Sequence, residues 1–188
     1  MTIRISNDFT QYVKILGRGK KGARSLTVEE AEHAMSLMLC GKAAPEQLGA
    51  FWMLIRIREE TVEETVGFTK ATRQYLAEKD ALNVKVDLDW PSYAGKRNEL
   101  PWFLLAALAL ANNGLNIVMH GHAFTGEERI YVDEAIKGLG LPICHSRVEI
   151  KPRLHQTGFA YISLENIEPA LGELMDLKYM LGLRSPVN

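Results

Sequence analysis

The first third of the chain has the pattern of short amphipathic helices. Apolar residues recur every three or four positions through residues 1–77, with polar residues between them. Thr-Val-Glu-Glu occurs twice, starting at Thr27 and Thr61, and each is a capping box in which the Thr hydroxyl and the second Glu satisfy the first backbone amides of a helix. We predict four helices that form a small bundle, at residues 8–16, 27–40, 45–58 and 61–76.

The middle of the chain has the pattern of a strand–helix–strand unit. We predict strands at residues 84–88 and 115–119. The helix between them has Pro101 in its first turn and ends at Asn113-Gly114. It is apolar nearly all round, which predicts that it is buried against a sheet. The ligands of such units lie at the carboxyl ends of the strands, here the loop PSYAGKR (91–97) and residues 120–122.

The last third predicts a helix at residues 127–138 and a buried strand at 158–163, followed by a final helix at 168–181. Between the first two, Pro142 and Pro152 predict an irregular stretch with one short strand near Val148. The fold class is therefore α/β with an N-terminal all-α domain, a helical bundle joined to a partial parallel α/β sheet.

The composition is that of an ordinary globular chain, with 47% hydrophobic and 24% charged residues. The longest apolar run, about ten residues from Trp102, is too short to span a bilayer, so no membrane partner is expected. The N-terminus lacks the apolar stretch of a signal peptide. Cys40 and Cys144 have no metal or redox spacing, which favours a cytoplasmic location.

The net charge of −1 conceals a cationic N-terminus, because the first 24 residues hold six Lys and Arg side chains against Asp8. Such a segment suits a polyanion or the acidic face of a partner, or it is simply a solvated surface. Its sequence from Gly17 to Gly22 matches G-x-G-x-x-G. The strand that a dinucleotide-binding loop needs before the first glycine is replaced by a predicted helix. The stretch is instead a cationic loop able to contact phosphates, or a plain helix linker.

Two further patterns carry candidate chemistry. His120 and His122 lie on one side of a strand end, but no HExxH, CxxC or carboxylate cluster accompanies them, so no metal site is predicted. In PSYAGKR, Gly95 permits close backbone approach, and Lys96 and Arg97 supply a point charge and a planar fork. With the start of the following helix, this predicts an anion site. The alternative is an exposed loop with solubilising charges.

Residues 26–73, including both capping boxes and Gln47-Leu48-Gly49-Ala50, resemble the N-terminal helical domain of glycosyltransferase family 3, which contains anthranilate phosphoribosyltransferase and pyrimidine nucleoside phosphorylases. Residues 181–184 resemble the family's LGxRTxFN segment. The resemblance implies a helical domain at 1–80 that usually mediates a homodimer and an incomplete phosphoribosyltransferase-like domain at 81–163. It also implies that residues 164–188 return to the helical domain.

The family's catalytic motifs are altered here. PSYAGKR replaces the GTGGDG loop that admits phosphoribosyl pyrophosphate, and residues 119–123 replace KHGNR. The acidic magnesium ligands would lie beyond Asn188, which makes the chain either a shorter protein or a fragment. Magnesium is expected only if phosphoribosyl pyrophosphate is bound, and no other cofactor is expected. The phosphate-binding residues implied are Ser92, Tyr93, Gly95, Lys96, Arg97, His120, Gly121, Lys178 and Arg184.

The GRGK…AR N-terminus and the PSYxGxR loop resemble the YbiB-like paralogue branch of the family. That resemblance implies a dimer that binds single- or double-stranded nucleic acid with low sequence specificity. We expect phosphate contacts from Arg18, Lys20, Lys21 and Arg24. Two alternatives remain open: a phosphoribosyltransferase with an unknown acceptor, and a helical dimerisation module whose loop charges only solvate it.

Overall fold

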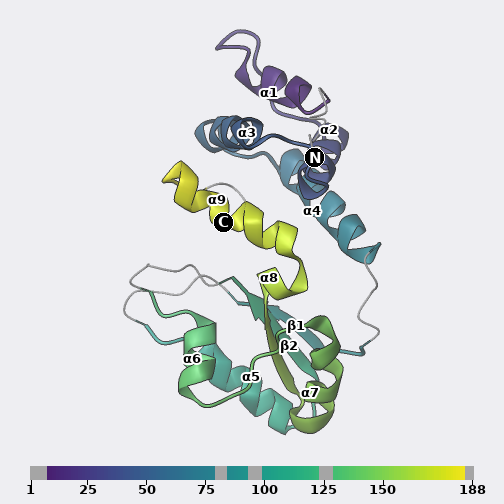
Figure 1. Cartoon of the computed structure of the whole chain (residues 1–188), viewed down its shortest axis with the longest axis vertical. Coiled ribbons are helices and arrows are strands. Elements are labelled where there is room, and N and C mark those ends of the chain that lie inside the picture. Colours follow the sequence, from purple (N-terminus) through teal and green to yellow (C-terminus); the bar gives the residue numbers. More distant parts are fainter. Residues whose placement is uncertain (1–7, 79–83, 93–98, 123–128, 185–188) are drawn as a thin grey trace, which may run out of the picture. The chain divides into compact units, whose positions relative to one another are not determined.

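The computed structural model describes residues 8–78, 84–92, 99–122 and 129–184 (Figure 1). The chain forms two compact units. One contains residues 1–81 and 173–188, and the other contains residues 82–172. Across the described residues, no helix is both long enough and apolar enough to cross a bilayer.

The first unit is helical and confirms the four helices expected from the N-terminal pattern. Its last element is a fifth helix, α9, most of which belongs to this unit although it follows the α/β unit in sequence. The helices are α1 (Thr10–Gly17), α2 (Val28–Leu39), α3 (Pro45–Arg58), α4 (Val62–Ala77) and α9 (Pro169–Leu181).

Both predicted capping boxes are formed, and one of them is buried. At α2, the Glu30 amide donates to the Thr27 hydroxyl at 3.2 Å, and the Thr27 amide donates to the Glu30 carboxylate at 3.0 Å. At α4, Glu64 is only 1% exposed. Its two carboxylate oxygens accept from the amides of Thr61 and Leu26, each at 2.9 Å. Glu64 therefore both caps α4 and fixes the chain that leads into α2.

Aromatic residues fill the core of the helical unit. Phe9, Phe51 and Trp52 are fully buried, and their rings contact in tilted and edge-on arrangements at 5.1–5.3 Å. Tyr12 of α1 also lies in this core. Its hydroxyl shares a hydrogen bond of 2.5 Å with Nδ1 of His33 in α2. The histidine inside the second helix thus joins α1 to α2.

The second unit is built on a three-stranded parallel sheet with the strand order β1-β2-β3. The strands are β1 (Leu88–Pro91), β2 (Ile117–Gly121) and β3 (Phe159–Ser163). The first was predicted at 84–88 and begins four residues later, because pairing with β2 starts only at Leu88. The second begins two residues later than predicted, since Leu115 still donates its amide to the Leu110 carbonyl at the end of the preceding helix.

Helices cover both faces of this sheet (Figure 1). One face packs against α5 and α6 and the other against α7, as two separate core clusters indicate. The helical elements of the unit are α5 (Phe103–Asn112), α6 (Val132–Gly138), a 3-10 turn (Arg147–Glu149), α7 (Ile150–Thr157) and α8 (Leu164–Ile167).

The irregular stretch predicted between residues 138 and 158 is wrong in part, because it contains α7. Val148 lies in the 3-10 turn, whereas the residue that touches the sheet is Cys144, which forms an isolated parallel bridge with Ile162. Pro152 did not prevent the helix, since it lies in the first turn of α7, where its missing N–H costs little. Gly158 ends α7 with φ of 69° and continues directly into β3.

The prediction that this helix is buried against the sheet is confirmed, but only for one side of α5. Leu104, Ala107 and Ala111 face the core, but Leu105 and Leu110 on the opposite side are 49% and 38% exposed. The sheet lies on one side of the helix only, and across the described residues nothing covers the other side.

Candidate phosphate-binding sites

The carboxyl ends of β1 and β2 are held tightly together. The Ser92 amide donates to the His120 carbonyl at 2.6 Å, and the Ser92 hydroxyl donates to the same oxygen at 2.9 Å. Gly121 faces Ser92 so closely that a Cβ at position 121 would overlap the serine hydroxyl. The structure thus brings together Ser92, His120 and Gly121. Tyr93, Gly95, Lys96 and Arg97, from the same predicted site, lie outside the described residues.

Carboxylates accompany both histidines at these strand ends. Nε2 of His120 lies 3.1 Å from Oδ1 of Asp89, and Nδ1 of His122 lies 3.5 Å from Oε2 of Glu165. A phosphate placed here would meet negative charge beside each imidazole, which opposes its binding. Among the described residues, the site thus contains two carboxylates that the sequence did not lead us to expect.

Two buried polar side chains from β3 also lie at this end of the unit. Tyr161 is 1% exposed, and burial raises the pKa of its phenol, with further upward contributions from the charges of Asp133 and Glu165; the Ser92 hydroxyl opposes the rise. The phenol is therefore a neutral donor at ordinary pH. The hydroxyl of Ser163 is buried, and it has no hydrogen-bond partner among the residues that the structure describes.

Neither Tyr161 nor Ser163 was predicted from the sequence as a site residue. Ser163 pairs with Gly121 in the strand register, so it lies at the same sheet end as the predicted site. Ser163 could have been found from the sequence, because it is the last residue of the strand predicted at 158–163. The carboxyl ends of neighbouring parallel strands are where ligands bind.

The described residues offer no group of three His, Cys, Asp or Glu side chains that could hold a metal ion.

Lys178 and Arg184 belong to the helical unit, whereas Ser92, His120 and Gly121 belong to the α/β unit. Partial burial lowers the pKa of the Lys178 ammonium, and the positive charge of Arg184 lowers it further.

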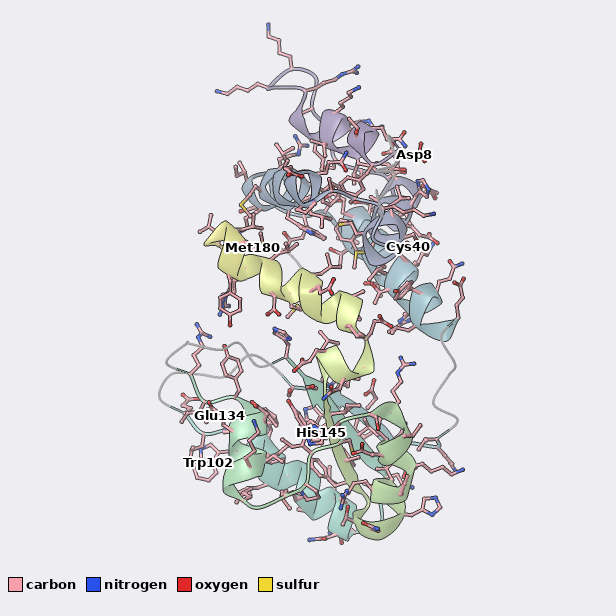
Figure 2. The ribbon with its side chains drawn as sticks, viewed as in Figure 1. Asp8, Cys40, Trp102, Glu134, His145 and Met180 are labelled. Carbon is pink, nitrogen blue, oxygen red and sulfur yellow. The ribbon has the colours of Figure 1, made fainter. Side chains whose placement is uncertain are left out.

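The loop after α1 presents a second candidate site. Gly19 adopts a φ of 79°, and its carbonyl accepts from the amides of Gly22 and Ala23 at 3.2 and 3.0 Å, which makes a tight turn. Arg18, Lys20 and Lys21 are all exposed around this turn. Figure 2 shows long side chains that end in nitrogen projecting from this loop into solvent.

Arg24, the fourth residue predicted to bind nucleic acid, is already engaged. Its two terminal nitrogens donate to the Glu30 carboxylate at 2.6 and 2.7 Å. This pairing raises the pKa of Arg24 and holds the pKa of Glu30 below its usual range. Arg24 therefore stabilises the α2 capping box through Glu30, and the cations of the loop that we consider for phosphate binding are Arg18, Lys20 and Lys21.

A groove of about 590 Å³ lies between α1 and α3. Its lining is mainly apolar and includes Val13, Met53, Leu54 and Ile57, with Lys14 and Arg18 also bordering it. Ile57 is 81% exposed, which is unusual for an isoleucine on a packed helix. The groove therefore combines an apolar surface with two cations.

The helical unit and the α/β unit together define a phosphoribosyltransferase-like fold. The crystal structure of anthranilate phosphoribosyltransferase from Thermus thermophilus matches with a TM-score of 0.69, over 94% of this chain and 52% of that chain, at 20% identity. Residues 10–75 match the family model described as the helical bundle domain of the glycosyl transferase family.

Sequence relatives agree with the fold. The anthranilate phosphoribosyltransferase of Methylocella silvestris is 30% identical over 174 residues, which are 93% of this chain and 49% of the relative. That of Salinibacter ruber is 29% identical over 168 residues, 87% of this chain and 47% of the relative. The chain is a glycosyltransferase family 3, anthranilate phosphoribosyltransferase-like protein. It spans about half the length of the curated relatives it matches.

Proposed function

We propose that this anthranilate phosphoribosyltransferase-like protein binds nucleic acid through the phosphate backbone, without sequence preference, as in the YbiB-like branch that its N-terminus resembles. The observation that carries the proposal is the exposed cationic cluster at the end of α1, formed by Lys14, Arg18, Lys20 and Lys21. Contacts of this kind give affinity that is independent of base sequence and depends on salt.

The arrangement of these charges favours an external anion. The negative end of the α1 dipole favours Lys14 and Arg18 in and just after its last turn. Lys20 and Lys21 lie beyond that turn. Lys14 and Arg18 are also spaced i,i+4, where like charges repel. An extended polyanion would neutralise all four charges at once.

The strand ends support this proposal over transfer chemistry. Asp89 and Glu165 accompany His120 and His122 there, so the described residues of this site offer a phosphate less positive charge than the loop after α1 does.

We further propose that two copies associate through the helical unit, with the groove between α1 and α3 as part of the interface. The exposed Ile57 supplies apolar area that a partner would bury. A dimer would carry two cationic loops. Once one loop is bound to a long polyanion, the other is held close to it at a high effective concentration, which strengthens binding.

The test is fluorescence anisotropy with labelled single- and double-stranded oligonucleotides of unrelated sequence, at about 50 and about 200 mM NaCl. If three phosphates are neutralised, log K falls with log[salt] with a slope of about −2.7, which is a loss of about 40-fold over this range. The triple variant R18A/K20A/K21A should lose most of both the affinity and the slope.

A matched control removes the same charge elsewhere on the helical unit. Lys42, Lys70 and Arg73 are exposed, so K42A/K70A/R73A has the same net charge as the loop variant. This control variant should bind the oligonucleotides with an affinity within about threefold of that of the unsubstituted chain, since the three residues that it lacks lie outside the loop. Equal losses in the two triple variants would contradict a site at this loop.

A second candidate is phosphoribosyl transfer to an unknown acceptor, which the hydroxyls of Ser92 and Ser163 at the strand ends favour. Both are polar groups at the sheet end where ligands of parallel α/β units lie. Titration calorimetry with phosphoribosyl pyrophosphate and magnesium tests it. A saturable heat of binding that Ser163→Ala abolishes would support the phosphoribosyltransferase candidate. The absence of any heat of binding would contradict that candidate and would not affect the nucleic-acid proposal.

A further inference from the structure

One of the three tryptophans of the chain lies in solvent. Trp102 is 64% exposed, whereas Trp52 is fully buried and Trp90 is half-buried. Tryptophan is highly buried on average, because its large ring removes much apolar area from water. Trp102 lies immediately before α5, and in Figure 2 it lies at the edge of the α/β unit.

The backbone holds Trp102 in place although its ring is exposed. Its amide donates to the Leu100 carbonyl at 2.8 Å, and its carbonyl accepts from the Leu105 amide at 3.0 Å. The next residue, Phe103, stacks on Trp90 of β1, with ring centroids 6.1 Å apart and planes inclined by 27°. A ring that is held in this way loses little conformational entropy when it binds a partner.

Among the described residues, the indole of Trp102 contacts no other aromatic ring, and its N–H donates no hydrogen bond. The ring therefore offers an aromatic surface and a free donor at its edge. Trp90, whose ring is near, belongs to the strand end at which the ligands of parallel α/β units lie.

The charges that adjoin these aromatic residues in the sequence are negative. Asp89 precedes Trp90, and Glu99 lies three residues before Trp102; both carboxylates are exposed. They disfavour a phosphate at this position, so an uncharged flat ring is the better partner. A nucleobase is flat, aromatic and uncharged at ordinary pH, and every base has a face that can stack on tryptophan.

We propose that Trp102 is a stacking site for an unpaired base of a single-stranded nucleic acid. This stacking site rests on the proposed nucleic-acid function and narrows it to single strands, because the bases of a duplex are already stacked on one another and do not reach the indole. It lies in the α/β unit, whereas the cations of the loop after α1 lie in the helical unit. Stacking tolerates any sequence, as phosphate contacts do.

The experiment is fluorescence anisotropy with three labelled ligands of equal length: a single-stranded oligothymidylate, a duplex, and an abasic strand that has the phosphates but no bases. Trp102→Ala should lower the affinity for the oligothymidylate about tenfold and change the other two affinities by less than about twofold. Trp102→Phe keeps a ring and should retain most of the affinity.

Tryptophan emission gives a second measurement of stacking. The oligothymidylate should quench the emission of the unsubstituted chain, whereas the abasic strand should not. Trp102→Phe should remove this quenching, which assigns it to Trp102. Val148→Ala is the matched control, since Val148 is also an exposed apolar residue of the α/β unit, in the 3-10 turn. It should bind and be quenched like the unsubstituted chain.

The salt dependence separates this site from the cationic loop. Stacking releases no counterions, so Trp102→Ala should keep the slope of log K against log[salt], whereas R18A/K20A/K21A should reduce that slope for all three ligands. If the loop variant has no effect while Trp102→Ala still weakens binding of the oligothymidylate, the assignment of the loop is wrong and the stacking site is supported.

Three results would overturn the stacking site. One is an equal loss of affinity for all three ligands in Trp102→Ala, and another is the absence of oligothymidylate binding by the unsubstituted chain. The third is quenching or a shift of Trp102 emission by tetramethylammonium chloride and not by the oligothymidylate, because a cation would then be the partner of the indole.

Discussion

Gly67 of α4 faces Ala31 of α2 across a gap too narrow for a methyl group. A Cβ at position 67 would lie 2.6 Å from the Cβ of Ala31 and 2.8 Å from the amide nitrogen of Glu32, and it would overlap the Val28 carbonyl. Two of these three atoms belong to the backbone, so the contact cannot be relieved by turning a side chain.

We therefore expect Gly67→Ala to lower the free energy of unfolding of the helical unit by about 2–3 kcal/mol, although alanine is the better helix former. Urea denaturation followed by Trp52 fluorescence, in a background where the other two tryptophans are phenylalanine, measures this. Gly49→Ala in α3 is the control, since its new Cβ would make only an ordinary contact with Leu181 at 3.4 Å. If Gly49→Ala lowered the free energy of unfolding more than Gly67→Ala does, the close contact between α4 and α2 at Gly67 would be contradicted.

Glu64 gives a second stability prediction. Both of its oxygens accept from backbone amides and the side chain is buried, so glutamine at this position would turn an NH2 group toward an N–H donor. We expect Glu64→Gln to cost about 1–3 kcal/mol in the same denaturation assay. Glu63→Gln, at an exposed position in the same turn, should change the unfolding free energy by under about 0.5 kcal/mol.

The Arg24–Glu30 pair predicts a pH dependence. The hydrogen bond from Arg24 lowers the pKa of Glu30 below its ordinary value of 4.5 in the folded state. The unfolded state therefore binds more protons in the acid range, and stability must fall as the pH falls. The contribution of Glu30 is present above the unfolded pKa and is lost as the pH passes below the folded pKa.

Denaturation at about pH 6 and about pH 3.5 tests this prediction. Glu30→Gln should reduce the difference in unfolding free energy between the two pH values, because the titrating group is gone. Glu63→Gln is the comparison. If both variants keep the full pH difference, Glu30 is not a source of the acid sensitivity.

The contact between Ser92 and Gly121 predicts a double-mutant result. Gly121→Ala should destabilise the α/β unit by about 1–3 kcal/mol, because the new methyl group would overlap the Ser92 hydroxyl. Ser92→Gly removes that hydroxyl and the Cβ, so the double variant should be more stable than the sum of the single effects predicts. Strict additivity would show that the two positions do not meet.

The proposal that two copies associate through the groove between α1 and α3 gives a further prediction. Ile57→Glu should shift sedimentation toward the monomer, because a carboxylate cannot enter an apolar interface without a partner. Val148→Glu in the other unit should leave the dimer intact. A monomer in both the parent and the variants would contradict dimerisation through this groove.

The helices of the N-terminal unit could be predicted from sequence because their signals are local. Thr27 and Thr61 with their glutamates determine where α2 and α4 begin, and the structure has both helices beginning at the next residue. Strand positions depend on partners far away in sequence. For this reason β1 was expected before Leu88, although its pairing with β2 begins only at that residue.

The burial of α5 could not be read from its composition. An apolar sequence predicts that the faces of a helix are buried, but it does not show which residues cover each face. The site was limited in a similar way. His120 and Gly121 could be assigned to a strand end, whereas the carboxylates of Asp89 and Glu165 come beside the histidines only through tertiary packing. Those carboxylates change the charge of the site and thus the ligand that it favours.

The part of α9 that belongs to the helical unit follows the whole α/β unit in the sequence. During synthesis, about 90 residues must therefore be added between α4 and the part of α9 that completes the bundle, which takes about 5 to 18 s at ordinary rates of translation. For that time, the side chains that α9 covers stay open to other partners. The α/β unit can fold first, as an insertion that brings the two parts of the bundle into reach. Variants that slow its folding would then delay the bundle as well, even when they touch none of its residues.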